Sequence, residues 1–231
     1  MIVFDGIDLQ DIAPVKIEDI RVSPIQLIPV ARQKVGFGQN FVRMDGKQRT
    51  VTITFALATE DLNERYQQLQ RIAEWAQPYK EKALSLPMFD NRYLECMCVG
   101  YPDPSYRQWW ESRLTLVFIT YANPYWTSDN EIRANCGTQF TVNGSAPPLM
   151  RIERRLTSKI ANQTYACKGK SMVFDRIPAG SMVIDLNKQT AEVSGASIMQ
   201  YFTKTSKFID PSTGNMTITG VGTVVYRERW I

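Results

Sequence analysis

The sequence has no histidine among its 231 residues. Imidazole is the usual general base and a common metal ligand, so its absence excludes Ser-His-Asp and Cys-His nucleophiles and histidine metal sites. A Gly-x-x-x-x-Gly-Lys phosphate loop is also missing, and Gly36-Phe37-Gly38 lacks the third glycine of a dinucleotide-binding fingerprint. Two carboxylates could still hydrolyse a glycoside, but clusters such as Glu60 with Asp61 are typical of turns and helix starts. We predict no enzymatic activity and no cofactor.

Long apolar runs are absent as well, because no stretch approaches the roughly 20 apolar residues that a membrane helix needs. The N-terminus opens with Asp5 and Asp8 rather than with a basic region and an apolar core, which is unlike a signal peptide. We therefore expect no membrane contact and reduced thiols at the four cysteines, Cys96, Cys98, Cys136 and Cys167. A four-thiolate zinc site is the alternative, but this spacing matches no common zinc motif, and we predict no bound metal.

The charge of the chain is small and unevenly distributed. The formal net charge is +4, with 15 Lys and Arg against 17 Asp and Glu in residues 1–133 and 10 against 5 in residues 134–221. The net charges of these segments, −2 and +5, indicate two units with different surroundings. A slightly acidic first unit is a poor match for DNA, so we expect no specific nucleic-acid binding.

Apolar periodicity predicts strands and one helix. Val51, Ile53 and Phe55 share one face of a strict period-two segment that also includes Leu57, which indicates a strand. Thr59 is expected to cap a helix over residues 60–77. Its predicted apolar stripe is Leu62, Tyr66, Leu69, Ala73 and Ala76, widened by Ile72 and Trp75. From Phe140 onward, short strands separated by glycine and proline are typical of a β-sandwich.

The most informative stretch joins these two parts. The strand at Leu114–Tyr121 stops at Asn123-Pro124-Tyr125-Trp126, because proline cannot continue a sheet ladder. A second strand pattern begins near Phe140 and is interrupted by Gly144-Ser145-Ala146-Pro147-Pro148. This arrangement resembles the junction of the phage distal tail protein (Dit) family, a component of siphophage tails. Three other segments resemble that family in order and spacing: Met1–Gly6, Lys47–Phe55 and Gly180–Asp185.

The resemblance implies a mainly β fold with one α-helix, divided into two domains. Residues 1–128 together with 222–231 would form an N-terminal β-sandwich-type ring domain, with the C-terminal strand returning to it. Residues 134–221 would form an inserted β-sandwich similar to galectin or carbohydrate-binding modules.

The resemblance also implies a function. The chain would be a structural ring hub at the tail tip of a phage or phage-like particle, made in the bacterial host cytoplasm. It would join the tail tube to the baseplate or tail fibre and dock receptor-binding proteins. Its expected partners are itself, as a homohexamer or stacked dodecamer, the major tail tube protein, a tail-associated hub or lysin protein, and receptor-binding proteins or side fibres. The alternatives are a host-glycan-binding adhesion module and a tail-tube or tail-terminator protein.

Three tryptophans are candidate subunit or partner contacts. Trp109 and Trp110 are adjacent just before a predicted strand, so one ring should be in the core and the other exposed or at a subunit contact. The alternative is that both are packing residues. Trp230 is in the final predicted strand. All five tryptophans lie outside residues 134–221, which lack the indole platform typical of sugar sites. Arg151–Arg155 predicts a strand with a solvated basic face, and a phosphate or acidic-partner patch is the alternative.

Overall fold

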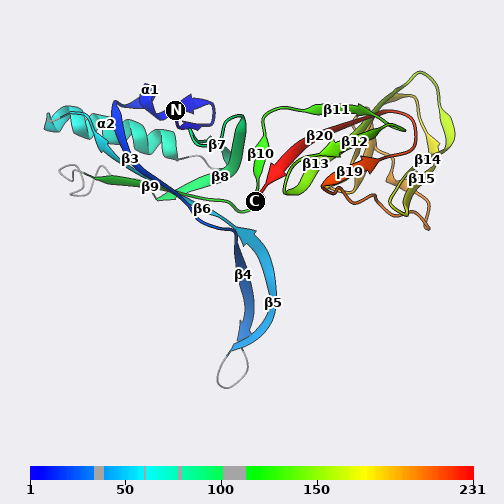
Figure 1. The fold of residues 1–231 in the computed structure, drawn as a ribbon, viewed down its shortest axis with the longest axis horizontal. Helices are drawn as coiled ribbons and strands as arrows, with labels where there is room; N and C mark the ends of the chain where they lie inside the picture. The colour runs from blue at the N-terminus through cyan, green and yellow to red at the C-terminus, as the bar shows by residue number, and fades with distance from the viewer. Residues whose placement is uncertain (34–38, 60, 78–79, 101–112) are drawn as a thin grey trace. The chain divides into compact units, whose positions relative to one another are not determined.

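The computed structural model of the chain describes residues 1–33, 39–59, 61–77, 80–100 and 113–231. The chain divides into two compact units, Met1–Trp126 with Ile231, and Thr127–Trp230. Both are built mainly from antiparallel strands (Figure 1), which confirms the predicted mainly β class. None of the helices in the described ranges is both long and apolar enough to cross a membrane.

The first unit contains an antiparallel sheet in the order β3, β6, β9, β8, β7, β1, β2. These strands are β1 (Val3–Phe4), β2 (Ile7–Asp8), β3 (Val15–Val22), β6 (Thr50–Leu57), β7 (Lys82–Ser85), β8 (Arg92–Gly100) and β9 (Leu114–Ile119). The strand predicted from period-two alternation is β6. Val51, Ile53 and Phe55 point into the core and are fully buried.

The predicted helix is α2 (Leu62–Ala76), but its start differs from the prediction. Asp61, not Thr59, is the N-cap, and its Oδ1 accepts the N–H of Glu64 at 2.8 Å. The predicted apolar stripe is also wrong at its first two positions, because Leu62 and Tyr66 are 52% and 45% exposed. Only the second half of the helix is buried, and its buried residues are Gln68, Leu69, Ile72, Ala73 and Ala76.

Aromatic rings hold α2 against the sheet. Trp75 packs edge-on against Phe4 of β1 and Phe118 of β9, with ring centroids 5.6 and 6.5 Å away. Phe4 and Phe118 are fully buried, so this cluster anchors the last turns of the helix to the sheet. A one-turn helix, α1 (Leu9–Ile12), precedes β3 and was not predicted.

A β-hairpin in the first unit forms a two-stranded sheet of its own. Its strands, β4 (Gln26–Gln33) and β5 (Gln39–Gln48), pair antiparallel with each other (Figure 1). A two-stranded hairpin is at best marginally stable in water, so it gains from contact with further surface.

The first unit ends at the predicted Asn-Pro stop. Asn123 Oδ1 accepts the N–H of Tyr125 at 3.2 Å, which fixes the turn. Trp126 is 2% exposed, and its ring lies 4.3 Å from that of Phe89 between centroids. The boundary between the units therefore follows Trp126, within the short strand β10 (Trp126–Ser128).

The second unit is a β-sandwich, as predicted. One layer is an antiparallel sheet in the order β18, β17, β16, β13, β20, β11. Its strands are β11 (Ile132–Asn135), β13 (Ala146–Leu156), β16 (Gly180–Asp185), β17 (Thr190–Val193), β18 (Ala196–Ser197) and β20 (Thr223–Trp230).

The facing layer of the second unit consists of two antiparallel strand pairs. The hairpin β14 (Ile160–Cys167) with β15 (Lys170–Ile177) is one pair, and β12 (Gln139–Val142) with β19 (Gly214–Thr217), which are far apart in sequence, is the other. A single 3-10 turn, Met199–Tyr201, precedes β19. Side chains from both layers form one buried cluster. From the main sheet it includes Met150, Ile152, Ile184, Val224 and Tyr226, and from the facing pairs Phe140, Tyr165, Met172, Phe174 and Met216.

The predicted domain boundaries need a correction at the C-terminal strand. The sequence suggested that residues 222–231 return to the first domain, but β20 lies between β11 and β13 of the second unit (Figure 1). Only Ile231 groups with the first unit. The physical reason is burial, because Val224 and Tyr226 belong to the core of the second unit. The second unit therefore begins at residue 127 rather than 134 and includes its own last strand.

Candidate functional site

Of the three predicted tryptophan contacts, only Trp230 lies among the residues that the structure describes. Trp109 and Trp110 lie outside the described residues, so their predicted roles stay predictions. Trp230 is the last residue of β20 and is half-buried. It belongs to the second unit, not to the ring domain in which the sequence placed it.

The Gly-x-x-Pro-Pro segment is explained by its contact with β20. A Cβ atom on Gly144 would be 2.3 Å from the carbonyl oxygen of Arg229, so only glycine fits there. The buried carboxylate of Glu228 accepts the N–H of Asn143 at 2.7 Å, and Arg229 Nε donates to the carbonyl of Pro147. The motif therefore fixes the end of β20 against the start of β13.

A network of arginines and glutamates covers the outward face of β11, β13 and β20. Arg151 donates two hydrogen bonds to Glu131, at 2.9 and 3.1 Å, and a third to Glu153 at 2.7 Å. Arg133 contacts Glu153 at 3.3 Å, and Arg227 contacts Glu131 at 3.5 Å. We call these five residues the Arg-Glu network. Sequence reasoning identified its β13 members and missed Glu131, Arg133 and Arg227.

The Arg-Glu network also covers an apolar side chain. Val225 pairs with Arg133 on one side and Arg151 on the other, and it is fully buried although it lies on the outward face. The hydrogen bonds from Arg151 lower the pKa of Glu131, and the same contact raises the pKa of Arg151. These charges are therefore paired with one another at a partly exposed surface.

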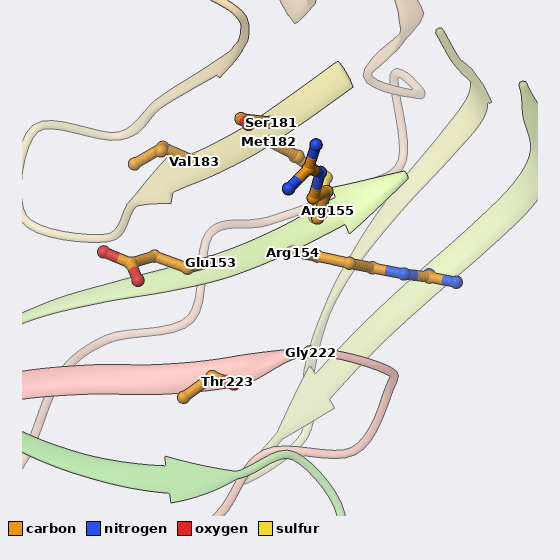
Figure 2. Close-up of a pocket in the computed structure, with 8 residues that line it drawn as sticks. All are labelled: Glu153, Arg154, Arg155, Ser181, Met182, Val183, Gly222 and Thr223. Atoms are coloured by element: carbon orange, nitrogen blue, oxygen red, sulfur yellow. The ribbon is translucent and has the colours of Figure 1, made fainter. Parts of the chain in front are cut away.

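An open pocket of about 410 Å³ lies beside the Arg-Glu network (Figure 2). Three neighbouring strands, β13, β16 and β20, supply its lining, and Gly222 precedes β20. The lining residues are Glu153, Arg154, Arg155, Ser181, Met182, Val183, Gly222 and Thr223. Arg154 extends away from Arg155 in Figure 2, and its Nη1 donates to Gln163 Oε1 at 2.7 Å. The pocket lies at the end of the basic segment that the sequence predicted.

Aromatic rings in the second unit are mostly committed to its core. The buried ones are Phe140, Tyr165, Phe174 and Tyr226. Phe202 stacks on Phe208 with centroids 4.9 Å apart, so each covers a face of the other. Tyr201 is half-buried, and the Arg176 guanidinium is 6.0 Å from the centre of its ring. The structure describes every residue of the second unit, and none of these rings lines the pocket of Figure 2.

The four cysteines are free and divided between the units. Cys96 and Cys98 lie two residues apart on the buried face of β8 in the first unit. Burial raises the pKa of both thiols, that of Cys98 to about 11. Cys167 is buried in the second unit, while Cys136 is half-buried there and its pKa is also raised by burial. Among the residues the structure describes, no three His, Cys, Asp or Glu side chains gather as metal ligands would.

Comparisons with known proteins identify the fold. No protein-family model matches the sequence, and no curated protein is similar to it. Among solved structures, the chain is similar to the Dit protein (gp 19.1) of phage SPP1, described as a paradigm of the hub adsorption apparatus in Gram-positive infecting phages. The TM-score is 0.75 at 14% identity, and the match covers 100% of this chain and 98% of that chain.

A weaker similarity links the chain to the phage p2 baseplate in its activated conformation with Sr. It covers 94% of this chain and 90% of that chain at 10% identity, with a TM-score of 0.45. The similarity to SPP1 Dit covers both units, so the resemblance stated from the sequence is confirmed for the fold: the chain has the two-unit fold of a solved phage distal tail protein.

Proposed function

We propose that this protein is a structural component of a phage or phage-like tail tip. In this proposal it is a ring hub that joins the tail tube to the baseplate or tail fibre and docks receptor-binding proteins. The observation that carries the proposal is the structural match to the SPP1 Dit protein, which covers 100% of this chain and 98% of that chain. Because fold alone does not determine function, the assembly and its partners need direct tests.

We further propose that the chain forms a homohexameric ring, single or stacked as a dodecamer, through its first unit. A closed ring of identical subunits needs a head-to-tail interface between two different surfaces of each subunit. The β4–β5 hairpin supports this proposal, because its strands pair only with each other among the described residues and would be stabilised by a neighbouring subunit. The tail tube protein and a tail-associated hub or lysin protein are the proposed axial partners.

The experiment is electron microscopy and mass photometry of the purified protein, alone and with the tail tube protein. We expect rings with six-fold symmetry. A matched variant replaces residues 27–47 by a short Gly-Ser linker and should stay folded by circular dichroism while losing ring assembly. Only monomers at high concentration, both with and without the tube protein, would contradict the hub.

The proposed location is the virion tail tip, after synthesis in the bacterial host cytoplasm. We propose a structural rather than an enzymatic role, in agreement with a sequence that has no histidine. Immunogold labelling of purified particles tests the location. Labelling along the whole tube, or at the head-proximal end, would instead favour a tail-tube or tail-terminator protein.

A further inference from the structure

We propose that the pocket on the outward face of the second unit binds an acidic side chain, Asp or Glu, of a partner protein segment. This inference deepens the docking role proposed above and rests on it for its biological partner. The residue that should hold the carboxylate is Arg155, at the end of β13 (Figure 2).

The first observation is that Arg155 differs from the other arginines on this face. Arg133, Arg151 and Arg227 are all bound to carboxylates of the Arg-Glu network. Arg154 is bound to Gln163. Arg155 is exposed and has no hydrogen bond or ion pair with any residue that the structure describes. Its guanidinium therefore has its donors available for an added ligand.

The second observation is the arrangement of side chains around Arg155. Ser181 lies opposite Arg155 in the β13–β16 register. The next row across the strands contains Val183, Glu153 and Thr223, because Glu153 pairs with both of the others. The pocket thus has a cationic end with a neighbouring hydroxyl, followed by a partly exposed valine that is 38% accessible and a threonine.

Glu153 also lines the pocket, and its negative charge would repel an acidic ligand if it were unpaired. Its two carboxylate oxygens are held by Arg151 at 2.7 Å and Arg133 at 3.3 Å. The negative charge is therefore compensated within the Arg-Glu network. In Figure 2 its carboxylate extends away from the guanidinium of Arg155, so it does not occupy the cationic end.

The chemistry of the lining favours a carboxylate on a protein segment. The planar guanidinium fork matches the two oxygens of a carboxylate, whereas phosphate sites usually gather several cations or backbone N–H groups. All residues of this unit are described, and no aromatic ring lines the pocket. The lining therefore offers no ring for a sugar to stack on. The net charge of +5 on residues 134–221 also favours an acidic partner.

The test measures binding of a fluorescein-labelled peptide of glutamate and valine residues to the full chain by fluorescence anisotropy at low salt. The matched peptide carries glutamine in place of glutamate. We expect saturable binding of the acidic peptide alone, weakened about three- to fivefold by Arg155→Gln, as for an exposed ion pair. The control Arg176→Gln removes an exposed arginine from a different sheet of the same unit and should change the affinity by less than about twofold.

A second variant, Val183→Glu, places a carboxylate beside Arg155 and should weaken the peptide at least as much as Arg155→Gln. The proposal is overturned if no saturable binding occurs, if Arg155→Gln and Arg176→Gln weaken it equally, or if Val183→Glu binds normally. It is also overturned if glucuronate or inorganic phosphate competes as well as the unlabelled peptide. Ring assembly is scored on the same samples. Rings without peptide binding refute this inference alone, and peptide binding without rings refutes the ring hub alone.

Discussion

Removal of the C-terminal strand should unfold the second unit. β20 pairs with β11 on one side and β13 on the other, so its loss leaves two sheet edges open. It also removes Val224, Val225 and Tyr226, which are 0%, 0% and 3% exposed. The test compares a fragment of residues 127–230, which contains the whole unit, with a fragment of residues 127–221.

The magnitude follows from the three buried side chains. Each is worth about 1.5–3 kcal/mol, and together they contribute about 5–9 kcal/mol, as an upper estimate. A typical domain has a free energy of unfolding of about 5–15 kcal/mol. The shorter fragment should therefore be largely unfolded at 25 °C, whereas the longer one should unfold cooperatively.

Circular dichroism with urea titration, and the dispersion of amide resonances in NMR spectra, distinguish the two outcomes. We expect a sigmoidal transition for residues 127–230 and none for residues 127–221. A cooperative transition in the shorter fragment would refute the placement of β20 in the second unit. It would also restore the boundary suggested by the sequence, in which residues 134–221 fold alone.

Three further predictions test individual contacts. Gly144→Ala should lower the free energy of unfolding by about 3 kcal/mol, because the added Cβ would meet the β20 backbone. The control Gly137→Ala, at a φ of +86° with open space around it, should lower it by about 1 kcal/mol. Equal losses in urea titrations would contradict the contact between Gly144 and β20. Glu131→Gln should cost less than about 1 kcal/mol at pH 7. Arg151 lowers the pKa of Glu131, so the stability that this ion pair adds is present above the usual carboxyl range and is lost as the pH falls through the folded-state pKa. A difference in the free energy of unfolding between Glu131→Gln and wild type that persists at pH 2 would contradict this. Cys98, with a pKa of about 11, should resist thiol reagents at pH 8 until the protein is denatured, when four thiols should titrate without stoichiometric zinc; one zinc per chain by elemental analysis would contradict this.

Local patterns predicted the elements better than their partners. The alternation in Val51–Leu57 gave a strand with the correct buried face, and the Asn-Pro stop gave the end of the first unit. The same kind of alternation in Val224–Trp230 predicted a strand but not the sheet that contains it. Period two specifies which side chains share a face, whereas the neighbouring strand depends on pairings far apart in sequence, such as Arg151 with Val225.

The helix shows a related limit. The three- and four-residue spacing of apolar residues in α2 is continuous from Leu62 to Ala76, yet only the part from Gln68 onward is buried. Periodicity identifies an apolar stripe but not how far the covering sheet extends. The N-cap was misplaced for a local reason, because Thr59 accepts the N–H of Asp61 and donates to Glu64, so both polar residues take part in the turn that precedes the helix.

The candidate docking site could be predicted only in part. The basic segment at Arg151–Arg155 was visible in the sequence, but its neutralisation was not, because Glu131 comes from outside β13 and contacts Arg151 across the sheet. The sequence cannot show which arginine stays unpaired. That distinction requires the register of three strands, and it separates Arg155 from Arg151.

The docking site and the fold of the second unit share the strand β20. Thr223 and Gly222 line the pocket, Arg227 belongs to the Arg-Glu network, and Val224 lies in the core. Truncation of this strand would therefore abolish peptide binding by unfolding the unit, whatever the true location of the docking site. The exposed positions Arg155 and Val183 change the pocket without changing the core, so only variants of this kind can locate the partner surface.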